Sequence, residues 1–338
     1  MSNGIRIAVS GTGGGAGQSV LKALAETDYD VVALDGEPLG AGLYTTNTSY
    51  LIPYANSPEL VDRILEICQQ ENVKLYFPGL DAELPILTQH RDRFKAAGVT
   101  LVVSSPDVVE LSDNKQLTYD ILVQHGFNVP KTYNMAETDP HNIPLAYPFV
   151  LKEREGGARS QNLYVVKSEE QLEGLLTRGL DLSNYVAQEY IEGDEYTCGS
   201  VNFDGTCYGV IVMRRILRDG DTYKCFSVRD ELIENEVKKI AEAIKPFGPC
   251  NVQLRVKDGK VYVFEINARC SGTTGARALC GFNEPKMIAD FILQGKTPEF
   301  TIKEQSILRY WKELVVENDL IETMKANGKL TQENPGKL

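Results

Sequence analysis

The chain has 338 residues, a length that suggests two or three domains of ordinary size. A hydrophobic fraction of 42% and a charged fraction of 24% are typical of a protein with buried cores, so the composition excludes general disorder. The 35 basic and 47 acidic side chains give a formal net charge of −12, which repels nucleic acid and anionic lipid at long range. We therefore expect no nucleic acid and no membrane as partners, and any anionic ligand must bind a local cluster of basic groups.

We expect no targeting signal in this sequence. No basic leader precedes the short apolar stretch at 5–9, and no window approaches 18 consecutive apolar residues, so we expect no signal peptide and no transmembrane helix. The seven cysteines are scattered without a C-x-x-C pair, which favours reduced, buried thiols over a disulfide or zinc framework. Together these features predict a cytoplasmic protein.

The first 105 residues alternate between strand-like and helix-like segments. Apolar stretches predict strands at 5–10, 30–35, 73–77 and 99–103. Between them, apolar residues recur at the three- and four-residue spacing of helices, as in the segment 60–68. Such alternation with short links predicts a parallel, doubly wound sheet. We assign residues 1–105 to one α/β domain.

From about residue 106 the pattern changes to a mixed α+β type. Ser112-Asp113 predicts a helix start that places Lys115 in the first turn. A helix is also expected near 231–246, among long strand-like segments with Asp-Gly hairpin turns at 204–205, 219–220 and 258–259. We divide this half into lobes at 106–185 and 186–325, followed by a polar tail at 326–338 that we expect to be frayed.

A glycine-rich segment, Gly11 to Gly17, lies between the first predicted strand and the first helix. It satisfies G-x-G-x-x-A, and Asp35 closes the second strand 18 residues after Gly17. One interpretation is a dinucleotide site, as in an NAD-linked oxidoreductase. The other interpretation is a tight strand-to-helix crossover in a relative of the nucleotide-binding fold. Such a crossover either binds no dinucleotide or takes part in binding an acceptor substrate. We favour this second interpretation.

Several short motifs follow one another in the second half in a defined order. They are the helix start 112–115, the strand end at Lys152 with the loop 156–161, the segment 186–195, and the strands 251–255 and 264–269. In this order and spacing the series resembles the ATP-grasp superfamily, in particular the halves of carbamoyl-phosphate synthase large subunits and similar stand-alone ligases. The resemblance covers nearly the whole chain. It implies a Rossmann-like pre-ATP-grasp domain with a parallel sheet, followed by a two-lobed α+β ATP-grasp domain.

The resemblance implies an ATP site built from both lobes. Lys115 and Lys152 match the two lysines that neutralise the nucleotide phosphates, a task that suits compact ammonium groups. The remaining matches are Gly156, Gly157, Arg159 and Ser160 in the loop over the phosphates, Gln188, Glu189, Tyr190 and Ile191 in the adenine-binding segment, and Glu195 at the ribose hydroxyls.

The metal-binding pattern of the family also has counterparts in this chain. Glu265 and Asn267 are two residues apart on one strand, so their side chains face the same side, and Gln253 is expected to face them from the paired strand. The resemblance implies that these oxygen ligands hold Mg²⁺, with Mn²⁺ as an alternative. Gln253 stands where many relatives have an acid, which leaves the number of metal ions open.

Three groups of residues are candidates for contact with the reacting molecules. Arg269 resembles the arginine that stabilises the transferring phosphoryl group. Arg214, Arg215 and Arg218 are candidates for the donor carboxylate or the phosphates, or they form a surface cationic patch. Asp81 and Glu83 follow a parallel strand, where open α/β sheets bind ligands, and either suit an acceptor amine or are helix-start acids.

The resemblance implies a ligase that joins two small molecules at the expense of ATP. A carboxylate attacks the γ-phosphate, which gives an acyl phosphate and ADP, and an amine then displaces phosphate to form a C–N bond. Lys152, Arg269 and Arg214 are the expected catalytic residues. An NAD-linked oxidoreductase and a non-catalytic ATP-binding protein remain as alternatives, and a homodimer is the oligomer we consider.

Overall fold

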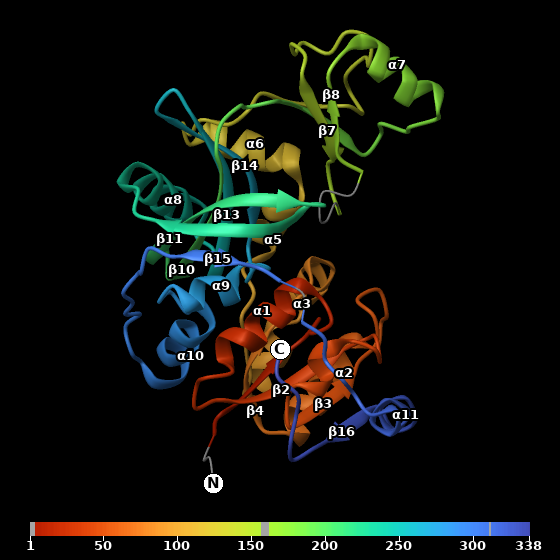
Figure 1. The fold of residues 1–338 in the computed structure, drawn as a ribbon, viewed down its shortest axis with the longest axis vertical. Coiled ribbons are helices and arrows are strands. Elements are labelled where there is room, and N and C mark those ends of the chain that lie inside the picture. Colours follow the sequence, from red (N-terminus) through yellow and green to blue (C-terminus); the bar gives the residue numbers. More distant parts are fainter. Residues whose placement is uncertain (1–3, 157–161, 311) are drawn as a thin grey trace.

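Three β-sheets and the helices that pack on them form the described structure (Figure 1). The computed structural model describes residues 4–156, 162–310 and 312–338. In Figure 1 the N-terminal sheet lies at one end of the long axis, the smallest sheet lies at the other, and a large antiparallel sheet lies between them. This arrangement confirms the predicted fold, a parallel α/β domain followed by a two-lobed α+β half.

The N-terminal sheet has the strand order β16-β3-β2-β1-β4-β5, in which β1 to β5 run parallel. These five strands are β1 (Arg6–Val9), β2 (Asp30–Asp35), β3 (Thr48–Leu51), β4 (Val73–Phe77) and β5 (Thr100–Leu101). The sequence patterns miss β3, which is only four residues long. Because β2 and β4 lie on opposite sides of β1, the carboxyl ends of β1 and β4 flank the switch point where open α/β sheets bind ligands.

Short helices connect these strands. They are α1 (Gly15–Leu24), α2 (Leu60–Gln70), α3 (Leu84–Gln89) and α4 (Arg91–Ala96), with the 3-10 turns η1 (Ala41–Tyr44) and η2 (Asp81–Glu83). Helix α2 buries the apolar side chains that its spacing predicts, including Leu60 and Ile64. Among the helices that the structure describes, none is long and apolar enough to cross a membrane.

The end of the chain returns to the N-terminal domain (Figure 1). Helix α11 (Asn318–Asn327) leads to β16 (Lys329–Thr331), which pairs antiparallel with β3. Leu330 is buried in a cluster with Leu43 and Met324. The prediction of a frayed tail is therefore wrong for this segment, because an apolar residue within a polar stretch completes a sheet edge.

The smallest sheet has the order β6-β9-β7-β8 and is antiparallel. Its strands are β6 (Thr132–Asn134), β7 (Phe149–Glu153), β8 (Tyr164–Val166) and β9 (Tyr185–Glu189), with α7 (Glu169–Thr177) between β8 and β9. Ser168 caps α7 by accepting a hydrogen bond from the Gln171 amide. Strand β7 carries Lys152 near its end and so places this side chain at the edge of the small sheet.

The large sheet has the order β14-β13-β10-β11-β12-β15. Its strands are β10 (Glu195–Phe203), β11 (Thr206–Arg218), β12 (Asp221–Val228), β13 (Gly248–Lys257), β14 (Lys260–Asn267) and β15 (Ser306–Leu308). Asp204, Asp219 and Asp258 have φ angles of 50°, 52° and 50°, and each is followed by a glycine with positive φ. These angles confirm the three predicted Asp-Gly hairpin turns.

Three helices cover one face of the large sheet. They are α5 (Pro106–Asp113), α6 (Lys115–Gln124) and α8 (Glu231–Ile244). Leu111 of α5 and Leu122 of α6 are buried in one cluster with Val237 and Ile266. Residues 106–124 therefore pack on the large sheet, although the sequence pattern groups them with the first lobe. The predicted helix start shifts as well, because Asn114 rather than Ser112 or Asp113 caps α6.

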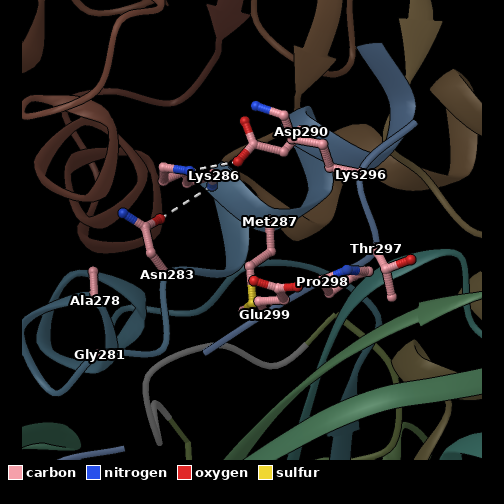
Figure 2. A pocket seen from close by; sticks show the side chains of 10 residues that line it. All are labelled: Ala278, Gly281, Asn283, Lys286, Met287, Asp290, Lys296, Thr297, Pro298 and Glu299. Carbon is pink, nitrogen blue, oxygen red and sulfur yellow. Dashed lines mark hydrogen bonds and ion pairs between the residues drawn. The ribbon is translucent and has the colours of Figure 1, made fainter. Parts of the chain in front are cut away.

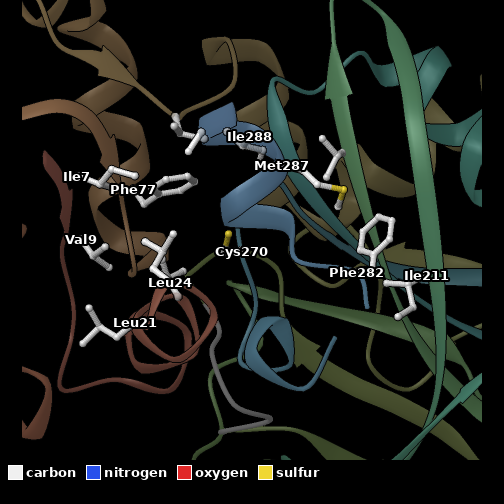
Figure 3. Packing of buried hydrophobic residues seen from close by; sticks show 14 of the residues in the cluster. Ile7, Val9, Leu21, Leu24, Phe77, Ile211, Cys270, Phe282, Met287 and Ile288 are labelled. Atoms are coloured by element: carbon white, nitrogen blue, oxygen red, sulfur yellow. The ribbon is translucent and has the colours of Figure 1, made fainter. Parts of the chain in front are cut away.

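One hydrophobic cluster joins the N-terminal domain to the large sheet (Figure 3). Leu24 and Phe77 from the first domain pack in it with Cys270, Phe282 and Ile288 from the segment that contains α9 (Thr274–Leu279) and α10 (Glu284–Gln294). Ser19 Oγ of α1 also donates to the carbonyl of Gly272 (2.8 Å). These contacts hold the loops that follow β1 and β4 against the segment that directly follows β14.

Candidate active site

Lys152 connects the small sheet to the large one. Its side chain is 7% exposed, and Nζ donates to the Phe264 carbonyl on β14 (2.9 Å). Burial lowers the pKa of Lys152 to about 8, while the nearby Glu265 carboxylate acts in the opposite direction and Lys115 adds to the decrease. A phosphate bound here would relieve the cost of keeping this ammonium charged.

Lys115 is the first residue of α6 and is also buried. Its Nζ donates to the Asp113 carbonyl (3.1 Å), and its backbone amide donates to the Arg154 carbonyl just after β7 (2.9 Å). The helix start and the end of β7 are therefore joined directly. This contact brings together the two lysines that the sequence analysis assigns to the phosphates.

A row of one carboxylate and two amides lies on β13 and β14. Gln253 pairs with Glu265 in the strand register, and Gln253 Nε2 donates to Glu265 Oε1 (2.9 Å). Asn267 Nδ2 donates to the same oxygen (2.9 Å). Within the described residues, Glu265 Oε2 and Asn267 Oδ1 make no hydrogen bond and are the oxygens available to a cation.

Metal sites made only of charged or sulfur ligands are not evident in this chain. Among the residues that the structure describes, no three His, Cys, Asp or Glu side chains gather in a way that could hold a metal ion. Glu265 and Asn267 instead offer one carboxylate and one amide oxygen, which are hard ligands of the kind that Mg²⁺ accepts alongside phosphates and water. The oxygen of Gln253 accepts a hydrogen bond from Arg215, so this structure does not support the prediction that Gln253 is a ligand. The donor set therefore fits Mg²⁺ bound together with a nucleotide.

Glu195 lies between two arginines on the neighbouring strands. Arg215 of β11 donates from Nε (2.9 Å) and Nη2 (2.6 Å) to Glu195 Oε1, and Arg255 of β13 donates to Oε2 (2.7 Å). Arg215 Nη2 also donates to Gln253 Oε1, so the network continues to Glu265. Arg255 is missing from the predicted site, although its position two residues after Gln253 on the same strand face could have indicated it.

Arg214 does not join this network. Side chains of successive strand residues point to opposite faces of a sheet. Arg214 lies opposite Tyr196 on β10, whereas Arg215 lies opposite Glu195. Arg214 pairs with Asp194 (3.6 Å) and lies over the Phe226 ring at 4.8 Å. Since neighbouring strand residues face opposite sides of a sheet, Arg214 faces away from Glu195, and we withdraw its catalytic assignment; Arg215 belongs to the Glu195 network instead.

The predicted adenine-binding segment begins at the end of β9. Gln188 is buried and donates to Thr132 Oγ1 (2.9 Å), while the Glu189 carboxylate accepts from the Lys131 amide (3.1 Å). Both side chains therefore support the small sheet.

Tyr190 and Ile191 connect this segment to the Glu195 network. Arg255 Nη1 donates to the Ile191 carbonyl (3.0 Å), and the Arg255 guanidinium lies 5.2 Å from the centre of the Tyr190 ring.

The loop predicted to cover the phosphates is described only at its start. Gly156 has a φ of 73°, and its amide donates to Asp113 Oδ1 (3.0 Å). Gly157, Arg159 and Ser160 lie outside the described residues. The Gly156 contact places the start of this loop beside the start of α6.

Arg269 and Asp81, assigned above to different substrates, bind each other. Arg269 Nε donates to Asp81 Oδ1 (2.6 Å), and Nη2 donates to Asp81 Oδ2. Asp81 opens the turn η2 after β4, and Arg269 lies two residues beyond the end of β14. The carboxyl edge of the N-terminal sheet therefore meets the acid and amide row of the large sheet at this pair.

Glu83 occupies a different environment although it lies on the same turn as Asp81. Its side chain is buried, and it accepts a hydrogen bond from Ser10 Oγ (2.5 Å). Burial raises the pKa of Glu83 to about 7, with a smaller contribution from Asp35, while the Ser10 hydrogen bond opposes the increase. Because the Glu83 side chain is enclosed by protein, the structure does not support the prediction that it contacts a substrate directly.

The glycine-rich segment is tightly packed. A Cβ on Gly17 would lie 2.2 Å from the Gly11 carbonyl oxygen, and the Asp35 carboxylate accepts hydrogen bonds from the amides of Gly13 (2.6 Å) and Glu37 (2.8 Å). Gly17 is thus required by close backbone contact, whereas a Cβ on Gly15 would meet nothing within 4 Å, and Asp35 closes the loop. This geometry favours the crossover interpretation over a dinucleotide site.

A surface cavity of about 570 Å³ lies elsewhere, beside α9 and α10 (Figure 2). Its lining includes Asn283, Lys286 and Asp290, and Figure 2 shows the ion pair between Lys286 and Asp290. None of the residues predicted from the sequence lines this cavity. We therefore do not assign it to the nucleotide site.

Two protein families match separate parts of the chain. The family described as "PylC-like, N-terminal domain" matches residues 5–102, and "ATP-grasp in the biosynthetic pathway with Ter operon" matches residues 181–313. Among curated proteins, the carbamoyl phosphate synthase large chain of Pseudomonas syringae pv. tomato is 23% identical over 318 residues, which cover 87% of this chain and 28% of that protein. The chain spans about a third or less of the length of the curated relatives that it matches.

Solved structures share the fold at low sequence identity. L-amino acid ligase from Bacillus licheniformis has a TM-score of 0.65 and 17% identity, with 87% of this chain and 75% of that chain covered. N5-carboxyaminoimidazole synthetase from Staphylococcus aureus, complexed with ADP, has a TM-score of 0.66 and 16% identity, with 91% and 81% covered. Residues 181–313 of this chain thus match an ATP-grasp family, residues 5–102 match a PylC-like N-terminal domain, and the chain shares its fold with these solved structures.

Proposed function

We propose that this chain is an ATP-dependent ligase that activates a small-molecule carboxylate as an acyl phosphate and joins it to an amine. The observation that carries the proposal is the contact between Lys152 and the Phe264 carbonyl. This contact places a buried ammonium group of the small sheet next to Glu265 on the large sheet. Cations for phosphates and oxygen ligands for a metal thus lie in one site, as the transfer of a phosphoryl group from ATP requires.

The proposed nucleotide contacts follow from these positions. Lys115 and Lys152 bind the phosphates, and the segment from Gln188 to Ile191 binds the adenine mainly through its backbone. Glu195 accepts the ribose hydroxyls while Arg215 and Arg255 keep its carboxylate oriented. Each buried lysine is held by a backbone carbonyl, which supports a role in binding rather than in accepting protons.

Glu265 and Asn267 would hold Mg²⁺, with Gln253 orienting Glu265 through its amide. When bound, the metal ion supplies charge neutralisation between neighbouring phosphates. We propose that Mn²⁺ can replace Mg²⁺, because the same oxygen ligands suit both ions.

The proposed chemistry needs positioning and charge but no covalent nucleophile. The lysines hold the γ-phosphate in line with the incoming carboxylate oxygen, whose attack gives the acyl phosphate and ADP. Arg269 stabilises the transferring phosphoryl group and then the acyl phosphate through charged hydrogen bonds. Attack of an amine on the acyl carbon releases phosphate and forms the amide.

Two broader proposals accompany this one. The seven cysteines are free and buried, as the sequence analysis predicts, which supports a reducing compartment such as the cytoplasm. A homodimer is our hypothesis for the oligomeric state, and light scattering of the purified chain tests it.

Release of ADP and phosphate across a matrix of carboxylates and amines tests the proposed function. We expect at least one pair to stimulate turnover, and Mg-ATP rather than NAD to raise the melting temperature. AMP as the product would contradict the acyl phosphate mechanism. ATP binding without turnover for any pair would favour a non-catalytic nucleotide-binding protein, and stabilisation by NAD would favour an oxidoreductase.

A further inference from the structure

The ion pair between Asp81 and Arg269 joins two segments that are 188 residues apart. Both hydrogen bonds run from the guanidinium fork to the two carboxylate oxygens. The Arg269 side chain is 14% exposed and that of Asp81 is 44% exposed, so the acid lies at the more open end of the pair. A bidentate pair of this kind occupies the same donor atoms that a phosphoryl group would use.

The turn that carries Asp81 is anchored to the N-terminal sheet. Glu83 accepts from Ser10 Oγ, and the Gly79 amide donates to the same hydroxyl (3.3 Å). A Cβ on Gly79 would lie 2.1 Å from the Ser10 carbonyl oxygen, so the backbones touch. Because this loop is fixed, opening of the pair requires a rotation of the Arg269 side chain, whose Nη1 also donates to the Cys270 carbonyl (2.9 Å).

Separation of the pair would leave Asp81 with an uncompensated negative charge. Among the described residues Arg269 is its ion-pair partner, and the other acid of the turn, Glu83, faces inward. A half-exposed carboxylate without its cation favours a ligand that carries an ammonium group. Asp81 is also adjacent to Arg269, where the proposed acyl phosphate forms.

We propose that Asp81 binds the ammonium group of the acceptor amine, and that Arg269 covers this carboxylate until the phosphoryl group takes the guanidinium. The inference rests on the proposed ligase function. It identifies the acceptor as an amine that arrives protonated, and it predicts that activation of the carboxylate precedes productive binding of the amine. Asp81 and Arg269 exchange partners in one step, so neither charge is left alone.

The transfer step balances as follows. The ammonium group gives one proton to Asp81, and its freed lone pair forms the C–N bond at the acyl carbon. The bond between that carbon and the bridging oxygen breaks, and the phosphate leaves with the electron pair. The second proton passes from nitrogen to the departing phosphate, and Asp81 returns its proton to water, so the products are the amide, hydrogen phosphate and one proton.

The first experiment measures the binding of orthophosphate to the enzyme saturated with Mg-ADP by calorimetry. Asp81→Asn frees Arg269 and removes a negative charge, so we expect phosphate to bind at least about fivefold more tightly. Asp62→Asn is the matched control, because Asp62 also pairs with an arginine, Arg93, at the exposed surface of the same domain. Unchanged or weaker binding in Asp81→Asn, with its circular dichroism intact, would show that Asp81 does not cover an anion site.

The second experiment compares two acceptors at neutral pH, hydroxylamine, which is uncharged, and the set of common amino acids, which carry ammonium groups. For Asp81→Asn we expect the ratio of amide to hydroxamate formation to fall by about tenfold or more relative to wild type and to Asp62→Asn. An unchanged ratio would overturn the inference while leaving the ligase proposal intact. Failure of wild type to form hydroxamate with any carboxylate would instead refute the ligase proposal, and the phosphate experiment would still test the Asp81–Arg269 pair.

Discussion

Replacement of the buried Glu83 by glutamine is expected to change how the stability of this protein depends on pH. Glu83 is 2% exposed, and burial raises its pKa from 4.5 to about 7. The groups around it are Ser10, Tyr76 and Asp35, and none of them supplies a positive charge. The difference between the two pKa values corresponds to about 3 kcal/mol of unfolding free energy.

The sign of this effect follows from proton binding. Between about pH 4.5 and pH 7 the folded protein keeps the proton on Glu83, whereas the unfolded chain has lost it. The unfolded state therefore binds fewer protons, and the stability falls as the pH rises through this window. Glutamine is neutral in both states and can still accept the hydrogen bond from Ser10, so Glu83→Gln removes this part of the pH dependence.

Urea denaturation of both proteins at pH 5, 6, 7 and 8 measures the effect. We expect the stability of wild type, relative to Glu83→Gln, to fall by roughly 2.5 kcal/mol between pH 5 and pH 8, because the unfolded chain already releases part of this proton below pH 5. Glu59→Gln, an exposed acid of the same domain, is the control and should show no such trend. A wild-type advantage that stays constant with pH would show that Glu83 is ionised in the folded protein and would refute the reasoning.

Three further predictions concern single side chains. Glu265→Ala should abolish ATP turnover while circular dichroism stays native, because it removes the carboxylate that we propose holds the metal ion; retained ADP release would show that this assignment is wrong. Glu284→Ala should lower the unfolding free energy by about 3–5 kcal/mol, since it leaves Arg277, which is 0% exposed, without its buried ion-pair partner, and a melting temperature equal to that of wild type would contradict this. Leu330→Ala should lower the unfolding free energy by roughly 2–5 kcal/mol, as measured by denaturant unfolding, because Leu330 fills the cluster under β16. A decrease no larger than that caused by a surface substitution would mean that β16 is not packed.

Local patterns in the sequence account for much of the fold. Alternating strand and helix segments predict the parallel N-terminal sheet, and the Asp-Gly pairs predict the hairpin turns of the large sheet, where Asp204, Asp219 and Asp258 adopt positive φ. The spacing of Glu265 and Asn267 likewise predicts that both face one side, and the hydrogen bond that Asn267 Nδ2 donates to Glu265 Oε1 confirms it. Such features depend on residues within a few positions of one another, so they can be derived from periodicity and turn preference.

Contacts between distant segments could be decided only by the tertiary structure. The polar tail becomes strand β16 because Leu330 finds a buried cluster formed by residues near position 43. Arg214 and Arg215 look equivalent in the sequence, and only the register of β11 against β10 shows which one faces Glu195. The pairing of Asp81 with Arg269 depends on the shared core that docks the first domain on the second half. The sequence by itself determined most of the longer elements and which residues can carry charge. Docking and register decided whether the short strands β3 and β16 form and which charges meet, because those depend on how separate hydrophobic faces pack together.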